Sequence, residues 1–196
     1  MTRSIRYDYT GARVLVTGGS SGIGHATATA FRDAGAEVVV TGTRDRDEVE
    51  VDLDAMTYRR LEVRDDGAVD ALGASFDRLD VLVNNAGANF PDGGDEWQPD
   101  VFEQALRLNL ASVFRLSVAC KPALVAAGGS VVNLASLSAF RAVPFVPGYA
   151  AAKAGVVGTT TTMASAWAAE GTPAEIRNDP AVRKAYLGEE SETTPA

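Results

Sequence analysis

The sequence predicts an α/β fold built around a doubly wound, parallel β-sheet, and three observations lead to that prediction. Short apolar runs of the kind that form buried parallel strands recur along the chain, and Val14-Leu15-Val16 is the first of them. Longer segments with helical periodicity separate these runs. Strands that alternate with helices form a parallel sheet covered on both faces, and such a sheet binds its ligand at the carboxyl ends of the strands.

The expected elements follow one another in that alternating order. Strands are predicted at residues 14–16, 37–41, 59–63, 81–83 and 130–134. Helices are predicted at residues 22–33, 65–76, 100–119 and 149–169. Asp100 and Glu103 have the spacing of a capping box at the start of the third helix, and Pro122 with Gly128-Gly129 is expected to end it.

Composition sets the broad class of the protein. The chain has 196 residues, of which 46% are hydrophobic, and this is enough for one substantial core. A net charge of −8 argues against a broad surface for nucleic acid or for anionic membranes. Cys120 and His25 are the single residues of their types, so an internal disulfide is excluded and no metal site is expected. The chain starts without the apolar run of a signal peptide, and no apolar stretch reaches membrane-spanning length without polar interruption. We therefore expect a soluble, cytoplasmic protein.

Three glycines, Gly18, Gly22 and Gly24, directly follow the first strand and open the first helix. Glycines in this position let the backbone turn tightly and let a pyrophosphate approach closely, while the helix N-terminus offers N–H donors. Ser20 and Ser21 add hydroxyl groups near the phosphates. The lysine of an ATP-binding P-loop is absent, so the turn predicts a dinucleotide site, with an ordinary glycine-rich βα turn as the alternative.

The end of the second strand is where a dinucleotide-binding protein distinguishes NAD from NADP. Here the sequence is Thr41-Gly42-Thr43-Arg44, with no acidic residue before Asp45. An acidic residue would bind the ribose hydroxyl of NAD, whereas Arg44 can pair with the 2′-phosphate of NADP. The pattern favours NADP over NAD, and a solvated surface arginine is the alternative interpretation.

Four polar residues can carry proton chemistry. Tyr149 and Lys153 are four residues apart in a predicted helix, so their side chains share a face. An ammonium group beside a tyrosine favours phenolate, and such a tyrosine can act as general acid in ketone reduction or general base in alcohol oxidation. Ser136, with Ser138 as its competitor, follows the fifth strand and can donate to a substrate carbonyl. Asn109, inside the third helix, can hold a water or a backbone group, or make local hydrogen bonds alone.

With these motifs in their observed order, the chain resembles the classical short-chain dehydrogenases/reductases over about residues 8–170. Thr17-Gly18-x-x-x-Gly22-x-Gly24 is similar to the cofactor loop of that family, and Asn84-Asn85-Ala86-Gly87 is similar to the motif after its fourth strand. Glu62-Val63 stands where the family often has Asp-Val beside the adenine. The combination of motifs is far more specific than any one of them.

The resemblance implies a Rossmann-like sheet with strand order 3-2-1-4-5, and hydride transfer between a nicotinamide cofactor and a small-molecule carbonyl or alcohol. Asn109, Ser136, Tyr149 and Lys153 match the family's catalytic tetrad in order and spacing. By this resemblance Tyr149 is the acid/base, Lys153 bonds the nicotinamide ribose, Ser136 orients the carbonyl, and Asn109 holds a water in a proton relay. The cofactor-binding residues that it implies are Gly18, Ser20, Ser21, Gly22, Ile23, Gly24, Thr43, Arg44, Glu62, Val63, Asn85, Ala86, Gly87, Tyr149 and Lys153.

After about Gly171 the sequence departs from this family pattern. No β-branched strand and no Pro-Gly turn follow, so the last strands of the family's sheet are expected to be missing. Residues 171–190 are instead similar to the C-terminal ends of ATP-binding subunits of amino-acid ABC importers. We therefore expect a dinucleotide-binding domain at residues 1–170 and an atypical helical or disordered tail at 171–196, with a short helix from Asp179 to Leu187. A rearrangement or a naturally unrelated tail would account for it.

This departure leaves three functions open. They are an NAD(P)-dependent oxidoreductase, whether or not the atypical C-terminus impairs its activity, a dinucleotide-binding pseudoenzyme that acts as sensor or scaffold, and a truncated product without an independent role. The fifth strand is expected to become an edge of the sheet. Phe140, Val143, Phe145 and Val146 suggest an apolar wall of a substrate pocket. A homo-oligomer is expected to form through the helices at 100–119 and 149–169.

Overall fold

The computed structural model of the chain describes residues 7–168. The described residues divide into two units, 7–156 and 157–168, and all the site residues predicted from the sequence belong to the first. The predicted helix from Asp179 to Leu187 and the rest of the tail lie outside the described residues.

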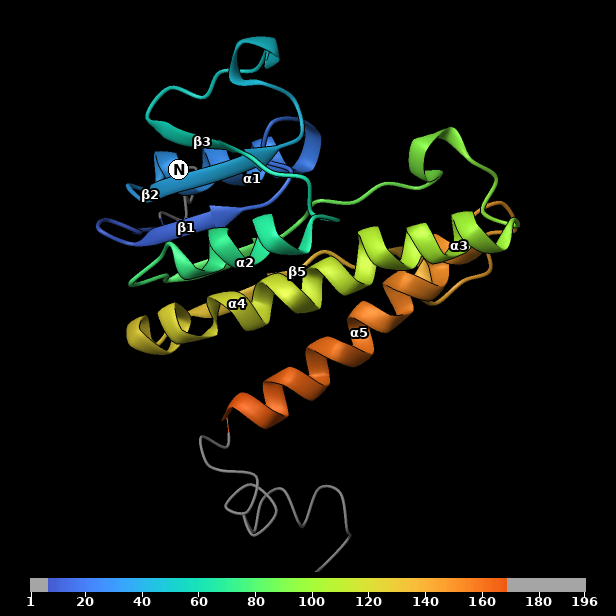
Figure 1. Cartoon of the computed structure of the whole chain (residues 1–196). Helices are drawn as coiled ribbons and strands as arrows, with labels where there is room; N and C mark the ends of the chain where they lie inside the picture. The colour runs from blue at the N-terminus through green and yellow to red at the C-terminus, as the bar shows by residue number, and fades with distance from the viewer. Residues whose placement is uncertain (1–6, 169–196) are drawn as a thin grey trace, which may run out of the picture. The chain divides into compact units, whose positions relative to one another are not determined.

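A five-stranded sheet forms the centre of the first unit (Figure 1). Its strands are β1 (Arg13–Val16), β2 (Glu37–Gly42), β3 (Met56–Arg60), β4 (Val81–Asn84) and β5 (Ser130–Asn133). They lie in the order β3-β2-β1-β4-β5, and every neighbouring pair is parallel. This confirms the predicted fold class and strand order. Within the described part of the chain β5 is an edge of the sheet, as expected.

Helices connect the strands. They are α1 (Gly22–Asp33), α2 (Asp66–Ala74), α3 (Pro99–Leu106), a π-helical turn η3 (Arg107–Ala111), α4 (Ser112–Ala127) and α5 (Pro147–Ala168). Three short 3₁₀ turns are η1 (Arg46–Glu48), η2 (Pro91–Gly93) and η4 (Leu137–Ala139). α1 packs on β1 and β2, while α4 packs on β4, β5 and α2. Figure 1 shows α2 and α4 running side by side.

The core occupies both faces of the sheet. Val14 and Val16 of β1 pack in one buried cluster with valines of β2 and β4 and with Ala28 of α1. Leu15 and Leu82, which alternate with these valines, are also fully buried at 0% exposure. Consecutive strand residues point to opposite faces, so both faces must be covered. This rigid centre holds the carboxyl ends of the strands in place.

Two predicted boundaries are wrong. The third strand runs from Met56 to Arg60 and not from residue 59 to 63, because residues 56–60 pair with β2 and the chain then leaves the sheet. The long helix starts at Pro99 with Gln98 as its N-cap and no side-chain cap bond, so the expected capping box does not form.

That helix also continues past Pro122 to Ala127. A proline removes one helical hydrogen bond, but Cys120 and Leu124 on either side are buried, so packing holds the helix together. Gly128, in the left-handed region at φ +62°, ends it.

The run from Pro99 to Ala127 is long and apolar enough to cross a membrane by length and composition alone, a property that core helices of soluble proteins share. In this structure the run carries ion pairs to α2. Arg107 pairs with Asp66, and Arg115 pairs with Asp66 and Asp70. The arginines of one helix and the carboxylates of the other therefore join α2 to the long helix on its polar side.

Candidate functional site

The glycine turn between β1 and α1 has the backbone shape that its sequence predicts. Gly18 and Gly22 adopt φ values of +64° and +52°, in the left-handed region that favours glycine. A Cβ added at Gly24 would lie 2.3 Å from the carbonyl oxygen of Gly18 and 2.4 Å from Nδ2 of Asn85. Glycine at residue 24 therefore allows the start of α1 to approach the turn closely.

Thr17 and Asn85, the residues that directly follow β1 and β4, make hydrogen bonds that hold this turn in place. The Thr17 hydroxyl accepts hydrogen bonds from the N–H groups of Asn85 and Ala86, both at 3.0 Å. The Asn85 amide donates to the carbonyl oxygens of Thr17 (2.8 Å) and Gly18 (3.2 Å). Asn84 turns the other way and donates to Asn133 of β5 at 2.8 Å. The segment Asn84–Gly87 therefore fixes the glycine turn relative to two neighbouring strands.

The N-terminus of α1 is suited to a phosphate group. Ser21 is its N-cap residue and makes no side-chain cap bond within the described structure. The first N–H groups of a helix have no partner inside the helix, and they attract anions together with the helix dipole. A Cβ at Gly22 would meet no atom within 4 Å, so the turn opens onto free space here. These features fit the pyrophosphate of a dinucleotide.

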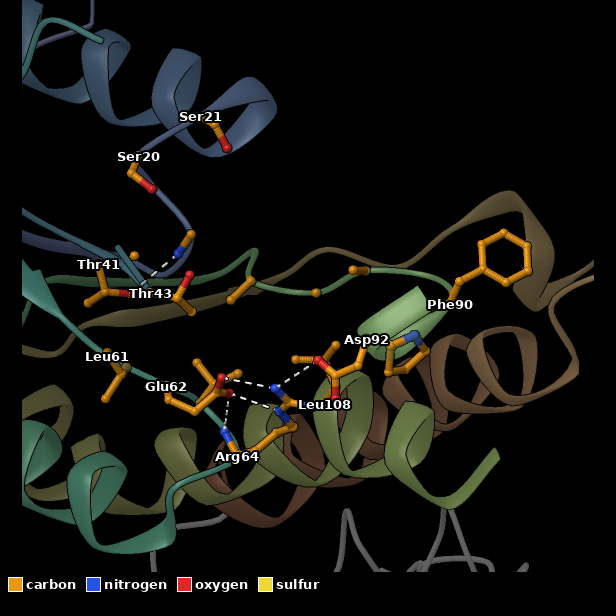
Figure 2. A pocket seen from close by; sticks show the side chains of 17 residues that line it. Ser20, Ser21, Thr41, Thr43, Leu61, Glu62, Arg64, Phe90, Asp92 and Leu108 are labelled. Atoms are coloured by element: carbon orange, nitrogen blue, oxygen red, sulfur yellow. Dashed lines mark hydrogen bonds and ion pairs between the residues drawn. The ribbon is translucent and has the colours of Figure 1, made fainter. Parts of the chain in front are cut away.

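A first pocket, of about 310 Å³, lies beside the glycine turn (Figure 2). It is lined by the ends of β1, β2, β3 and β4 and by the start of the β4–α3 loop. The lining residues that the sequence predicted are Gly18, Ser20, Ser21, Thr43, Glu62, Val63, Ala86 and Gly87. Thr41 lines it as well, and its hydroxyl accepts a hydrogen bond from the N–H of Gly18 at 3.3 Å.

Arg64 spans one side of this pocket. Figure 2 shows its guanidinium between Glu62 and Asp92. Arg64 Nη2 donates to Glu62 Oε2 at 3.1 Å, and Nη1 donates to Asp92 Oδ2 at 2.8 Å. The hydrogen bonds from this guanidinium hold the pKa values of both carboxyl groups below their usual range. Both acids are therefore carboxylates at neutral pH, and Arg64 joins the end of β3 to the β4–α3 loop.

Of the two cofactor-binding residues predicted at the end of β2, Thr43 and Arg44, only one lines the pocket. Thr43 lines the pocket, whereas Arg44 is exposed and lies outside the lining. Asp45, the first acid after the strand, accepts a hydrogen bond from Arg60 at 2.9 Å. Arg60 also donates to the carbonyl oxygen of Thr43 at 2.9 Å. The first acid is therefore paired with a guanidinium.

A second pocket, of about 350 Å³, continues from the first and shares Gly18, Ser21, Ala86 and Gly87 with it. Its remaining lining residues are Gly22, Ile23, Gly24, Asn85, Leu134, Ala135, Tyr149 and Lys153. The glycine turn and the proton-handling pair, more than 120 residues apart in sequence, therefore meet in one cavity. An elongated ligand that occupied both pockets would pass over the N-terminus of α1.

Lys153 is held at the inner end of the second pocket. Its ammonium Nζ donates to the carbonyl oxygen of Leu134 at 2.6 Å and lies 5.6 Å from the centre of the Tyr149 ring. The side chain is 3% exposed, and burial lowers the pKa of its ammonium group. A buried ammonium beside a tyrosine ring, at the spacing that the sequence predicted, is a geometry suited to proton transfer.

Asn109 lies in the π-helical turn η3 and is 0% exposed. Its Nδ2 donates to the carbonyl oxygen of Ala88 at 2.8 Å, and its Oδ1 accepts from the N–H of Ala88 at 3.0 Å. The side chain thus holds a backbone group, one of the two uses predicted for it. A Cβ at Gly87 would lie 2.4 Å from Asn109 Oδ1 and 3.7 Å from Lys153 Nζ, so Gly87 separates these two side chains. π-Helical turns often occur at functional sites.

Ser136 is the one predicted catalytic residue whose hydroxyl is occupied by another candidate, Ser138. It is the N-cap of η4, and its hydroxyl oxygen accepts hydrogen bonds from the N–H and the hydroxyl of Ser138, at 3.2 and 2.9 Å. Ser136 lines neither of the two pockets, although its neighbour Ala135 lines the second. The two competing serines are therefore hydrogen-bonded to each other beside the cavity.

Sequence reasoning missed the roles of Thr17, Thr41 and Arg64 in shaping the cavity. One signal was available for Thr17. Thr17 directly follows the first predicted strand, and the carboxyl ends of the strands are where such a sheet binds its ligand. For Arg64 the partner Asp92 is 28 residues away in a loop, and no local pattern indicates that contact.

Comparison with known proteins gives two family matches. Residues 12–178 match the model described as short chain dehydrogenase, and residues 168–192 match the model described as branched-chain amino acid ATP-binding cassette transporter. The second match falls on the segment whose resemblance to such transporters the sequence indicated.

Curated relatives and solved structures agree with the first match. The chain is 32% identical to 2-dehydro-3-deoxy-D-gluconate 5-dehydrogenase of Escherichia coli (strain K12) over 81% of its own length and 66% of the relative's. It is 33% identical to D-threitol dehydrogenase of Mycolicibacterium smegmatis, over 86% of this chain and 70% of that one. A crystal structure of a short chain dehydrogenase from Mycobacterium smegmatis matches with a TM-score of 0.69 and 32% identity, over 83% of this chain and 75% of that one. The chain thus spans just under two-thirds of the E. coli relative.

Proposed function

The chain belongs to the short-chain dehydrogenase family, and on this basis we propose that it is an oxidoreductase that transfers a hydride between a nicotinamide dinucleotide and a carbonyl or alcohol carbon. The observation that carries the proposal is the pair of connected pockets. Tyr149 and Lys153 lie at one end of the connected pockets, and the carboxyl ends of β2 and β3 lie at the other. The N-terminus of α1, which is suited to a phosphate group, lies between these two ends.

The cavity has a natural order of subsites. The adenine would lie in the first pocket near Glu62 and Val63, the phosphates at Ser21 and Gly22, and the nicotinamide ribose near Lys153. When bound, the dinucleotide supplies or accepts the hydride. The chain positions the two reactants and supplies the proton.

We assign the proton to the Tyr149 hydroxyl, which would donate to the carbonyl oxygen in reduction and accept from the alcohol in oxidation. Lys153 would bond the nicotinamide ribose, and its ammonium lies 5.6 Å from the centre of the Tyr149 ring. Ser136 would orient the carbonyl after its hydroxyl turns from Ser138. Asn109 would keep the Ala88 backbone in place beside Lys153, where a water could join a proton relay.

For the cofactor we propose NADP ahead of NAD. Asp45 is paired with Arg60, and this weakens its ability to bind a ribose hydroxyl. Arg44 is exposed one residue earlier and is free to turn toward a 2′-phosphate. For the substrate, the names of the relatives make sugar acids and polyols the first compounds to test.

Titration of NADPH and NADH by fluorescence, followed by carbonyl-reduction and alcohol-oxidation assays, tests this proposal. We expect NADPH to bind more tightly than NADH. We expect Tyr149→Phe to retain binding and to lower turnover by about a hundredfold to ten-thousandfold, because the proton donor is removed.

Tyr7→Phe is the matched control, since Tyr7 is 70% exposed and lies outside both pockets. Turnover that survives in Tyr149→Phe would contradict the assigned role. Binding without any Tyr149-dependent turnover would instead favour the dinucleotide-binding pseudoenzyme, which acts as a sensor or scaffold.

A further inference from the structure

Glu96 is a fully buried carboxylate in the loop between β4 and α3, with 0% of its surface exposed. Its sequence context, Gly94-Asp95-Glu96-Trp97, is that of a solvated turn. A buried carboxylate is costly unless hydrogen bonds replace its water. The partners of Glu96 therefore indicate what the residue does.

Both carboxylate oxygens accept a hydrogen bond from a backbone N–H. Oε1 accepts from Phe90 at 2.8 Å, and Oε2 accepts from Tyr149 at 2.7 Å. Tyr149 is the third residue of α5, so its N–H has no partner inside the helix, and a negative charge at this end is favoured by the helix dipole. Glu96 thus caps the helix that carries the proposed acid/base residue.

The other partner belongs to the wall of the first pocket. Phe90 lines that pocket and has φ +51°, a left-handed conformation that a phenylalanine rarely adopts (Figure 2). Such a conformation persists only where its surroundings hold it. Trp97 adds a connection between the β4–α3 loop and the segment before α5, since its Nε1 donates to the carbonyl oxygen of Pro144 at 2.8 Å.

We propose that Glu96 is a positioning residue that sets Tyr149 in register with the wall of the dinucleotide pocket. The proposal rests on the function proposed above. Glu96 touches neither cofactor nor substrate. It acts through the two backbone groups that it joins, those of Phe90 in the lining of the first pocket and of Tyr149 in the lining of the second.

The chemistry of the contact explains why a carboxylate is needed. Two N–H donors require two acceptor atoms, and a glutamine offers one acceptor and one NH₂ group. In Glu96→Gln an NH₂ group must therefore face an N–H, and one of the two connections is lost. Glu96→Asp keeps both acceptors but shortens the side chain by one methylene, so it is expected to weaken the connections less completely.

The experiment compares Glu96→Gln with Glu103→Gln, the same chemical change at an exposed residue of α3. We expect Glu96→Gln to lower kcat by roughly tenfold to a hundredfold, because small misplacements of a catalytic group are costly. Its Kd for NADPH is expected to stay within about threefold of the unmodified protein, because the glycine turn is untouched. Hydrogen exchange at the Tyr149 amide is expected to accelerate. Glu103→Gln is expected to change none of these quantities.

The outcomes separate this proposal from the one on which it rests. Unchanged kcat in a Glu96→Gln protein with faster exchange at Tyr149 would overturn the positioning role, as would exchange equal to that of Glu103→Gln. Equal losses in kcat and NADPH affinity would also overturn it. If Glu96→Gln does not fold, Glu96→Asp takes its place, and a smaller loss confined to kcat supports the role. If the unmodified protein shows no turnover, the proposed function fails, and amide exchange alone decides about Glu96.

Discussion

Two regions of the molecule differ sharply in their contacts: the dinucleotide cleft, formed by the two connected pockets, and the loop between β5 and α5. In the cleft, the Thr17 hydroxyl accepts a hydrogen bond from the N–H of Asn85, and the Asn85 side chain donates to the carbonyl oxygen of Thr17. In the loop, Leu137, Phe140 and Phe145 are 66%, 73% and 72% exposed. One region is shaped by contacts within the described chain, and the other presents apolar side chains to solvent.

This difference shows which part of the proposed activity the described residues supply by themselves. Within the described residues, hydrogen bonds of Thr17 and Asn85 help to set the shape of the cleft. A group of exposed apolar side chains is typical of a surface that binds a ligand, another protein or a membrane. Phe140, Val143 and Phe145, three of the residues expected to form an apolar pocket wall, are exposed, whereas Val146 is 5% exposed and belongs to the core. The wall itself stays a prediction.

The largest effect should come from filling the tightest point of the cleft. Gly24→Ala places a methyl group 2.3 Å from a backbone oxygen that cannot move without opening the turn. Overpacking of this kind costs about 1–3 kcal/mol, so we expect NADPH binding to weaken by roughly tenfold to a hundredfold.

The control is Gly158→Ala, where a Cβ meets no atom within 4 Å in the middle of α5. Alanine in a helix interior is more favourable than glycine by about 1 kcal/mol, so this variant should be slightly more stable and bind NADPH normally. Normal binding by Gly24→Ala would show that the cleft is not the rigid region described above.

A smaller effect should appear in the pH dependence of stability. Burial lowers the pKa of Lys153, so between that lowered value and about 10.4 the unfolded chain keeps a proton that the folded chain has lost. Stability therefore rises with pH across this window. The free energy of unfolding, measured in urea at several pH values from 7 to 10.5, should rise relative to that of Lys153→Met. A difference that does not vary with pH would contradict a buried ammonium at this end of the cleft.

The smallest effect is expected in the exposed loop. Phe145→Ala removes a side chain that is 72% exposed, so the free energy of unfolding should change by less than about 0.5 kcal/mol, and NADPH affinity should be unchanged. If the loop binds substrate, KM should rise while Kd for NADPH stays constant. A large loss of stability would show that Phe145 is packed against the fold, and would contradict the description of this loop as exposed.

Much of the fold could be predicted because its signals are local. The valine-rich runs of β1, β2 and β4 and the helical spacing of Tyr149 and Lys153 require only a few neighbouring residues to interpret. The prediction was wrong where pairing and packing override local pattern. β3 starts at Met56 because it pairs with β2, and the long helix passes Pro122 because its flanking residues are buried.

The candidate site divides along the same line. The sequence by itself determined the glycine turn, the tyrosine–lysine pair and the family, because each depends on residue type at short spacing. The tertiary structure alone decided that Arg64 reaches Asp92 and that Glu96, whose sequence context is that of a solvated turn, is buried and accepts a hydrogen bond from the N–H of Tyr149. Those contacts join residues 28 and 53 positions apart, and a buried charge is tolerated only where the assembled backbone brings its hydrogen-bond donors.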